Sequence, residues 1–257
     1  MEYQGQLSEN KRKQYSKLAR AKGREESGLF LAEGEKVVLT MLPSYVPEAF
    51  LLADGREDLL EDLHRRCQDV PVFQTDQTTI RSISQLQSAK DLLAVFRIPE
   101  DFSPILPASG IIVALDRVQD PGNMGTIIRL CDWLGISTLL CGVGCVDVYN
   151  PKVVQASAGA LSPNTLFRNV DLSDLLTHTS LPVVGTRMDA PTVFSAESLE
   201  GLSSAIILFG NEGQGLSSEL SSVCTHWLSV PPAPQARSES LNVGVSAAII
   251  LSQLLHP

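Results

Sequence analysis

The chain has 257 residues, a length that predicts one or two globular domains, and its 44% hydrophobic residues supply enough apolar material for a buried core. This composition excludes a disordered or collagen-like chain. The formal net charge of −9 at pH 7 argues against a nucleic-acid partner, yet residues 10–24 contain seven basic residues and no acid.

The N-terminal region, residues 1–97, alternates helical and strand patterns. The basic segment predicts a helix up to Gly23, and apolar residues three to four apart predict a second helix over 33–42. Strands are expected over 49–54 and 70–75, with a helix over 57–67 between them. This alternation is typical of a small α/β domain.

A proline-rich stretch over residues 98–109 separates this region from the rest of the chain. It contains Pro99, Pro104 and Pro107. Because proline fixes φ and cannot donate to a strand ladder, we interpret the stretch as an extended linker. The expected domains are therefore residues 1–97 and residues 110–257.

The C-terminal region alternates apolar strands with helices. Strands are expected over 111–118, 137–142, 182–188, 205–211 and 226–232. Helices are expected over 125–135, 151–161, 215–224 and 240–256. The near-continuous apolar strands indicate a parallel sheet buried on both faces, so we predict a doubly wound α/β domain.

Ligands of open α/β sheets bind at the carboxyl ends of the strands, and three junctions there are rich in glycine, proline and short polar residues. The first, residues 116–129, contains Asn123 and Arg129. Asn123 is as well placed to cap the following helix as to bind a ligand. Arg129, in an otherwise apolar helix, either pairs with an acid or faces a functional cleft.

The other two junctions offer a similar choice between structural and functional roles. Glu212 lies among glycines that allow close approach of a ligand, and it is equally compatible with an exposed turn. In the third junction, residues 230–244, Ser240 precedes the last helix and Asn242 lies in its first turn. Ser240 alone is typical of a helix N-cap, whereas Leu241 is expected in the core or a pocket wall.

Several other functions lack their sequence signals. The glycines of the second junction follow the order GxxGxG, which is not the dinucleotide fingerprint, and no P-loop is present. The four histidines are scattered, and Cys141 and Cys145 have no second pair, so no metal site is expected. With five cysteines, an odd number, and no membrane helix or signal peptide, we expect free thiols in the cytoplasm.

Taken together, DPGNMGTIIR, GNEGQGLS and SLNVGVSAAI resemble the three ordered motifs of the SpoU (TrmH) branch of the SPOUT RNA methyltransferases. The resemblance covers residues 111–257, and the N-terminal region resembles the small RNA-binding domain of many members. It implies a parallel-sheet domain tied into a deep trefoil knot, S-adenosylmethionine as cofactor, and a homodimer whose active site is completed across the interface.

The resemblance also implies roles for individual residues. Arg129 matches the arginine proposed to deprotonate the ribose 2′-hydroxyl, assisted by the remaining polar residues of the motifs, Asn123, Glu212, Ser240 and Asn242. The cofactor contacts are expected at Gly185, Thr186, Gly210, Val230 and Leu241. The third junction departs from the family pattern, because VPPAPQARSES is proline-rich and contains no glycine.

The leading hypothesis is therefore an S-adenosylmethionine-dependent 2′-O-ribose methyltransferase acting on structured RNA, ribosomal rather than transfer RNA. The basic segment is expected to bind that RNA through Lys11, Arg12, Lys13, Lys17, Arg20, Lys22 and Arg24, unless it is only a solvated helix face. The alternative is a non-catalytic RNA-binding or ribosome-assembly protein that keeps the fold. The complete polar set of the three motifs favours the enzyme.

Overall fold

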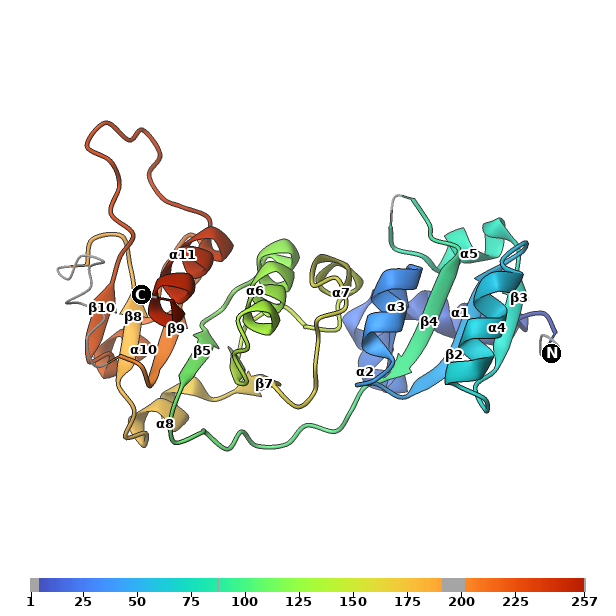
Figure 1. Ribbon diagram of the computed structural model, residues 1–257, viewed down its shortest axis with the longest axis horizontal. Helices are drawn as coiled ribbons and strands as arrows, with labels where there is room; N and C mark the ends of the chain where they lie inside the picture. Colours follow the sequence, from blue (N-terminus) through green and yellow to red (C-terminus); the bar gives the residue numbers. More distant parts are fainter. Residues whose placement is uncertain (1–4, 87, 191–201, 257) are drawn as a thin grey trace. The chain divides into compact units, whose positions relative to one another are not determined.

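The computed structural model describes residues 5–86, 88–190 and 202–256, and the chain divides into two compact units (Figure 1). The N-terminal unit comprises residues 1–100 and 147–163. The C-terminal unit comprises residues 101–146 and 164–257.

The N-terminal unit is built on a four-stranded sheet with the order β1-β4-β2-β3. Its strands are β1 (Leu29–Glu33), β2 (Pro47–Ala53), β3 (Val72–Thr75) and β4 (Leu92–Arg97). Strand β4 is antiparallel to β1 and β2, whereas β2 and β3 are parallel. The expected α/β architecture of this region is confirmed, although β1 and β4 were not anticipated from the sequence.

The helices of this unit are α1 (Glu9–Ser16), α2 (Ala21–Ser27), α3 (Glu35–Met41), α4 (Glu57–Arg66) and α5 (Gln77–Ile83), with a short 3-10 helix, η1 (Lys17–Ala19). The basic segment is thus three pieces and not one helix, because Arg20 is extended between η1 and α2. Ser8 caps α1, and Tyr15 on α1 and Leu18 on η1 are buried in the core. The opposite face of α1 is left to solvent.

Residues 147–163 pack within the N-terminal unit, although the sequence pattern assigned them to the C-terminal domain. Arg24 is 2% exposed and donates through Nε to Asp147 at 2.7 Å. The ring of Tyr149 lies 4.6 Å from that of Phe30 on β1. The helix of this segment, α7 (Pro151–Ala156), also ends earlier than the expected residue 161.

The C-terminal unit is built on a six-stranded parallel sheet with the order β10-β8-β9-β5-β6-β7. Its strands are β5 (Ile111–Leu115), β6 (Leu139–Gly142), β7 (Leu166–Val170), β8 (Val183–Thr186), β9 (Ala205–Phe209) and β10 (His226–Leu228). This confirms the predicted parallel sheet, to which the structure adds β7.

Helices cover both faces of that sheet. They are α6 (Pro121–Trp133), α8 (Leu172–Thr177), α10 (Ser218–Val223) and α11 (Val243–Leu255). Ile112 and Ala114 share a core with Leu172 and Leu220, whereas Val113 points to the other face and is also buried. Helix α6 packs against α11, and α8 packs against α10.

Two further features bear on the expectations from the sequence. Among the residues described, no helix is long and apolar enough to cross a membrane. The trefoil knot stays a prediction that follows from the family resemblance.

Candidate functional site

The carboxyl ends of four neighbouring strands, β5, β8, β9 and β10, lie at one edge of the C-terminal sheet because the strands are parallel. Asp116 follows β5 and is buried. It accepts hydrogen bonds from Arg117 Nε at 2.9 Å and from the Ser217 backbone N–H at 2.7 Å. A buried carboxylate thereby ties the loop after β5 to the loop after β9.

Three side chains from the three sequence junctions form a continuous hydrogen-bonded chain. Asn242 Nδ2 donates to Asn123 Oδ1 at 2.7 Å, and Asn123 Nδ2 donates to Glu212 Oε1 at 2.8 Å. Asn123 is free for this role because Asp120, not Asn123, caps α6. The chain fixes the orientation of both amides and engages one oxygen of the Glu212 carboxylate.

The approach of α6 to α11 places Asn242 beside Asn123. Asn242, not Ser240, caps α11, and its Oδ1 accepts from the backbone N–H groups of Gly244 and Val245. A Cβ atom on Gly244 would lie 3.1 Å from Cγ2 of Thr126, so the glycine permits the close contact between the helices. Asn242 therefore has both a structural and a positioning role.

The loop that carries Glu212 is held by residues that the sequence patterns did not single out. Asn211 donates to the Arg117 carbonyl at 2.9 Å, and its Oδ1 accepts from the N–H groups of Gly213 and Gln214. Arg117 in turn donates to Gln214 Oε1 at 2.9 Å and to the Gly215 carbonyl at 3.2 Å. The only signal in the sequence was the position of Arg117 and Asn211 at strand ends.

Arg129 lies apart from the hydrogen-bonded chain in this structure. It is exposed on α6 and, within the described part of the chain, has no hydrogen-bond or ion-pair partner. Six residues of helix place it ~9 Å along the axis from Asn123 and roughly a third of a turn around it. Of the two alternatives raised by the sequence, pairing with an acid is therefore not observed.

Ser240 and Leu241 also lie apart from the hydrogen-bonded chain of Asn242, Asn123 and Glu212. All residues from 231 to 242 are exposed, and Figure 1 shows the chain from β10 to α11 as an arc that stands away from the sheet. Leu241 is 47% exposed, so its expected place in the core or a pocket wall is not observed in this unit.

The remaining residues expected to contact the cofactor lie at the same edge of the sheet. Thr186 ends β8, Gly210 follows β9, and Val230 lies just beyond β10. Thr186 Oγ1 donates to the Leu208 carbonyl at 2.8 Å, which joins β8 to β9. Their contacts with S-adenosylmethionine stay a prediction that follows from the family resemblance.

The two glycines of this set are required by protein packing. A Cβ atom on Gly185 would lie 2.6 Å from the Trp227 ring and 2.8 Å from Cys224 Sγ. At Gly210 it would lie 2.4 Å from the carbonyl carbon of Gly215, where the loop that carries Glu212 turns back. Gly210 therefore acts on the site by shaping that loop.

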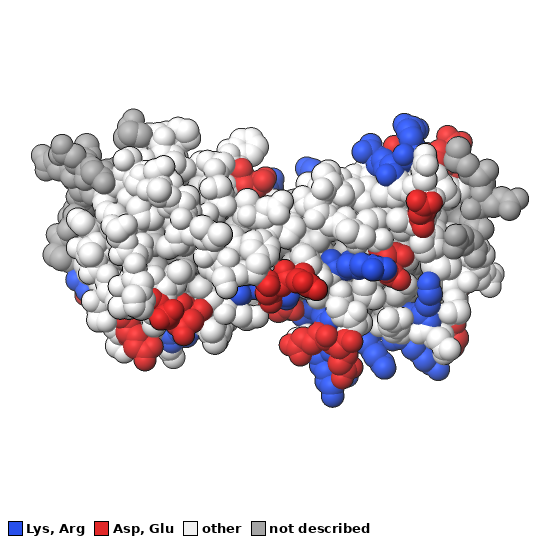
Figure 2. Space-filling model, turned by 90° about the horizontal axis from the view of Figure 1, so that it is seen from below, with Lys and Arg blue, Asp and Glu red and all other residues white. Residues whose placement is uncertain are grey.

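The basic segment is only partly free to meet a ligand. Arg12 donates to Glu9 at 2.9 Å and lowers the pKa of that carboxyl, so Glu9 stays ionised and offsets the charge of Arg12. Lys11 lies 4.8 Å from the centre of the Phe73 ring, and Lys22 lies 3.7 Å from Glu26. Figure 2 shows basic side chains gathered over the N-terminal unit, with acidic ones interleaved.

Arg24 must be withdrawn from the expected RNA-binding set. Its guanidinium is buried, donates to the Leu18 carbonyl at 2.8 Å and pairs with Asp147. A side chain held in this way cannot reach a phosphate at the surface. Arg20 and Lys17, in contrast, are exposed.

The thiols of the C-terminal unit do not form an alternative reactive centre. Burial raises the pKa of Cys131 to about 12 and that of Cys145 to about 11, so both are protonated near neutral pH. In the described part of the chain, no group of three or more histidine, cysteine or acidic residues is arranged to hold a metal ion.

Comparisons with known proteins identify the family of both regions of the chain. Residues 110–252 match the model of the SpoU rRNA Methylase family, and residues 9–94 match that of the MRM3-like substrate binding domain. The chain is 29% identical to the 23S rRNA (guanosine(2553)-2′-O)-methyltransferase RlmP of Bacillus subtilis, over 94% of each chain.

Two solved structures resemble the whole chain. A TrmH-family protein of Porphyromonas gingivalis is 32% identical, with a TM-score of 0.80 over 96% of this chain and 98% of that one. An AdoMet-bound rRNA methyltransferase of Sinorhizobium meliloti is 25% identical, with a TM-score of 0.83 over 98% of this chain and 97% of that one.

Proposed function

The chain belongs to the SpoU rRNA methylase family, and from this premise we propose that it transfers a methyl group from S-adenosylmethionine to a ribose 2′-oxygen of ribosomal RNA. The observation that carries the proposal is the hydrogen-bonded chain of Asn242, Asn123 and Glu212. These residues come from three distant parts of the sequence and meet at the edge where α/β sheets bind ligands.

The polar chain has a specific task in this reaction. The cofactor supplies a methyl group on a sulfonium, and its transfer is an in-line displacement that depends on the orientation of the attacking oxygen. Glu212 uses one carboxylate oxygen for Asn123, which leaves the other to position the ribose. Asn242 keeps the amide of Asn123 turned so that this contact is maintained.

We propose that Arg129 accepts the proton of the ribose 2′-hydroxyl. A guanidinium is protonated at all accessible pH values, so it can act as a base only with help from its surroundings. In this proposal an oxygen of a substrate phosphate accepts a proton from Arg129, so that the neutral guanidine can accept the 2′-hydroxyl proton, and the hydroxyl of Ser240 orients the phosphate. Both residues are exposed, so the RNA and the closing of residues 231–242 over the strand ends complete the site.

We further propose that the chain acts as a homodimer in the cytoplasm. Val245 and Ile249 are 48% and 37% exposed and lie one turn apart on one face of α11, and Leu241, two residues before the helix, is 47% exposed. Apolar side chains in such a stripe favour a protein partner over solvent. A second copy of α11 would cover the stripe and place residues 231–242 of each copy near the other.

The dimer is tested by measuring molecular mass by sedimentation. Val245→Asp is expected to convert a dimer to a monomer, because the new carboxylate loses its hydration in the interface. Ser218→Asp, an equally exposed change on α10, is the control and should leave the mass unchanged. A wild-type protein that sediments as a monomer at all concentrations would contradict this part of the proposal.

The activity is tested with ribosomal RNA and radiolabelled S-adenosylmethionine. Arg129→Ala is expected to abolish methyl transfer while cofactor binding, measured by calorimetry, stays at the wild-type level. Arg81→Ala, which removes an exposed arginine from α5, should retain full activity. If the wild-type protein binds RNA but not S-adenosylmethionine, the proposed activity is contradicted and the alternative, a non-catalytic RNA-binding protein, is supported.

A further inference from the structure

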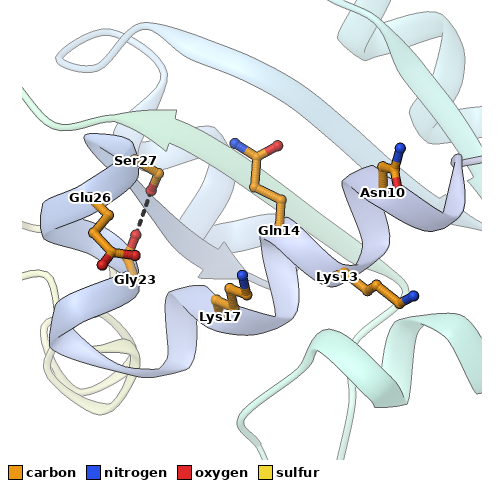
Figure 3. Close-up of a pocket in the computed structure, with 7 residues that line it drawn as sticks. All are labelled: Asn10, Lys13, Gln14, Lys17, Gly23, Glu26 and Ser27. Atoms are coloured by element: carbon orange, nitrogen blue, oxygen red, sulfur yellow. Dashed lines mark hydrogen bonds between the residues drawn. The ribbon is translucent and has the colours of Figure 1, made fainter.

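A polar groove runs along the solvent face of α1 and reaches α2, with a cavity volume of about 410 Å³. Helix α1 contributes three side chains at helical spacing, η1 contributes the next one, and α2 contributes the rest. The lining residues, which Figure 3 shows, are Asn10, Lys13, Gln14, Lys17, Gly23, Glu26 and Ser27.

Two lysines give the groove its positive charge. Lys17 is exposed and has no ion-pair or hydrogen-bond partner for its ammonium among the residues described. Lys13 is 3.6 Å from Glu9, an exposed contact that a stronger anion can displace. One helical turn separates the two lysines, so both ammonium groups can reach a single extended anion.

Uncharged and acidic groups lie beside the lysines. Asn10 and Gln14 are one turn apart on the same face of α1, and both amides are exposed. In Figure 3, Glu26 lies at the α2 end of the groove, away from Asn10. Glu26 lies 3.7 Å from Lys22 and is largely exposed, so its carboxylate can still accept hydrogen bonds.

The shape of the groove depends on the contact between α2 and η1. A Cβ atom on Gly23 would lie 2.1 Å from the Lys17 carbonyl, so only glycine allows this approach. Ser27 donates to the Gly23 carbonyl at 2.7 Å and is thereby held at the wall. The floor is therefore rigid backbone, and the ligand-binding groups are the longer side chains at its rim.

We propose that this groove binds the ribose–phosphate backbone of one RNA strand and recognises the 2′-hydroxyl. Lys13 and Lys17 neutralise successive phosphates, while the amides of Asn10 and Gln14 and the carboxylate of Glu26 exchange hydrogen bonds with ribose hydroxyls. The proposal rests on the proposed function, because it takes RNA as the substrate.

The composition of the groove argues for backbone and against base recognition. None of its lining residues is aromatic, and an unstacked base needs a ring or a guanidinium plane to replace its lost stacking. Glu26 would repel a phosphate, but it is a good acceptor for a hydroxyl proton. A site with donors, acceptors and one carboxylate therefore favours RNA over DNA, which lacks the 2′-hydroxyl.

The test compares binding of a fluorescein-labelled RNA hairpin with that of a DNA hairpin of the same sequence. Gln14→Ala is expected to weaken RNA binding by about 3- to 10-fold, the value of one hydrogen bond, with DNA binding unchanged. Lys17→Ala should weaken both and reduce the slope of log K against log salt by about one. Lys36→Ala, which removes an exposed lysine on α3, is the charge-matched control.

The outcomes distinguish failure of the groove proposal from failure of the proposed function. An unchanged ratio of RNA to DNA affinity in Gln14→Ala and Glu26→Ala would overturn recognition of the 2′-hydroxyl. If the slope of log K against log salt is the same for Lys17→Ala and Lys36→Ala, the groove does not contact the RNA. If the wild-type protein methylates ribosomal RNA in either case, the proposed function stands and only the groove assignment fails.

Discussion

Arg117 has a positive φ of 54°, a backbone conformation that residues with a Cβ atom rarely adopt. The strain is offset by contacts that only this conformation allows. Its side chain donates to Asp116, Gln214 and Gly215, and its carbonyl accepts from Asn211. One residue thus connects the end of β5 to both sides of the loop that carries Glu212.

Two substitutions separate the strain at Arg117 from its contacts. Arg117→Ala removes the side-chain contacts and keeps the strain, whereas Arg117→Gly removes both. We therefore expect the glycine variant to be more stable than the alanine variant by about 1 kcal/mol, measured as the free energy of unfolding in urea. Both variants should lose methyl transfer about equally, since both release Glu212. Wild-type activity in either variant would show that Glu212 does not need the clamp.

The buried ion pair of Arg24 and Asp147 is expected to be the most sensitive polar contact of the N-terminal unit. Arg24→Met leaves the Asp147 carboxylate without its partner and should lower the free energy of unfolding by about 3 kcal/mol. Arg20→Met, an exposed arginine in the same segment, is the control and should change it by less than about 0.5 kcal/mol. Equal effects of the two changes would contradict the burial of Arg24.

The sequence could predict some members of the candidate site and not others, for a physical reason. Glu212 and Asn123 follow strands, and strand ends of a parallel sheet share one edge, so their convergence follows from the pattern. The burial of Arg24 depends on Asp147, which is remote in sequence. No local pattern carries that information, and the prediction that Arg24 binds RNA was wrong.

At the scale of elements, five strands of the C-terminal unit were predictable, whereas β1, β4 and β7 were not, although β1 and β4 are largely apolar and buried. Strands β5 and β9 are five-residue runs of buried apolar side chains. Strand β7 contains Arg168 and Asn169, and its sequence does not separate it from a loop. Strand β1 merges into the helical pattern of α3, and only Gly34, with a φ of 91°, marks the break.

Three cysteines of the C-terminal unit carry thiols with raised pKa values: Cys131 in α6, Cys141 in β6 and Cys145 in the turn after β6. Burial raises the pKa of Cys141 well above its usual value, as it does for Cys131 and Cys145. In the unfolded chain these thiols ionise near pH 9, whereas in the folded chain the pKa is about 11 for Cys145 and about 12 for Cys131, and that of Cys141 is shifted in the same direction. The folded state therefore loses stability as the pH rises between these values.

This alkaline instability can be measured by urea unfolding between about pH 8 and about pH 10. Each buried thiol should contribute a decrease of about 1.4 kcal/mol per pH unit above pH 9. Cys131→Ala is expected to reduce the slope of unfolding free energy against pH by the contribution of one thiol, although it also lowers stability at neutral pH. An unchanged slope in this variant would mean that Cys131 ionises in the folded protein.

For the molecule as a whole, the placement of charge matters more than the net value of −9. The sequence predicted a basic segment, and the structure shows that Glu9, Glu26 and Asp147 offset part of it. Among the residues described, Lys17 and Arg20 are the exposed members of the segment whose charge no acidic partner offsets. We therefore expect RNA binding to be weak and strongly salt-dependent, since few phosphates can be neutralised.

The division of the chain was predicted at a single linker, but residues 147–163 belong to the N-terminal unit, so the chain passes between the units three times. A fragment of residues 1–97 would keep the buried charge of Arg24 without its partner and expose the face of Phe30 that Tyr149 covers. The two units are consequently not exchangeable modules. A substrate-binding domain taken from a relative would need the matching residues 147–163 as well, so two separate parts of the gene must change together.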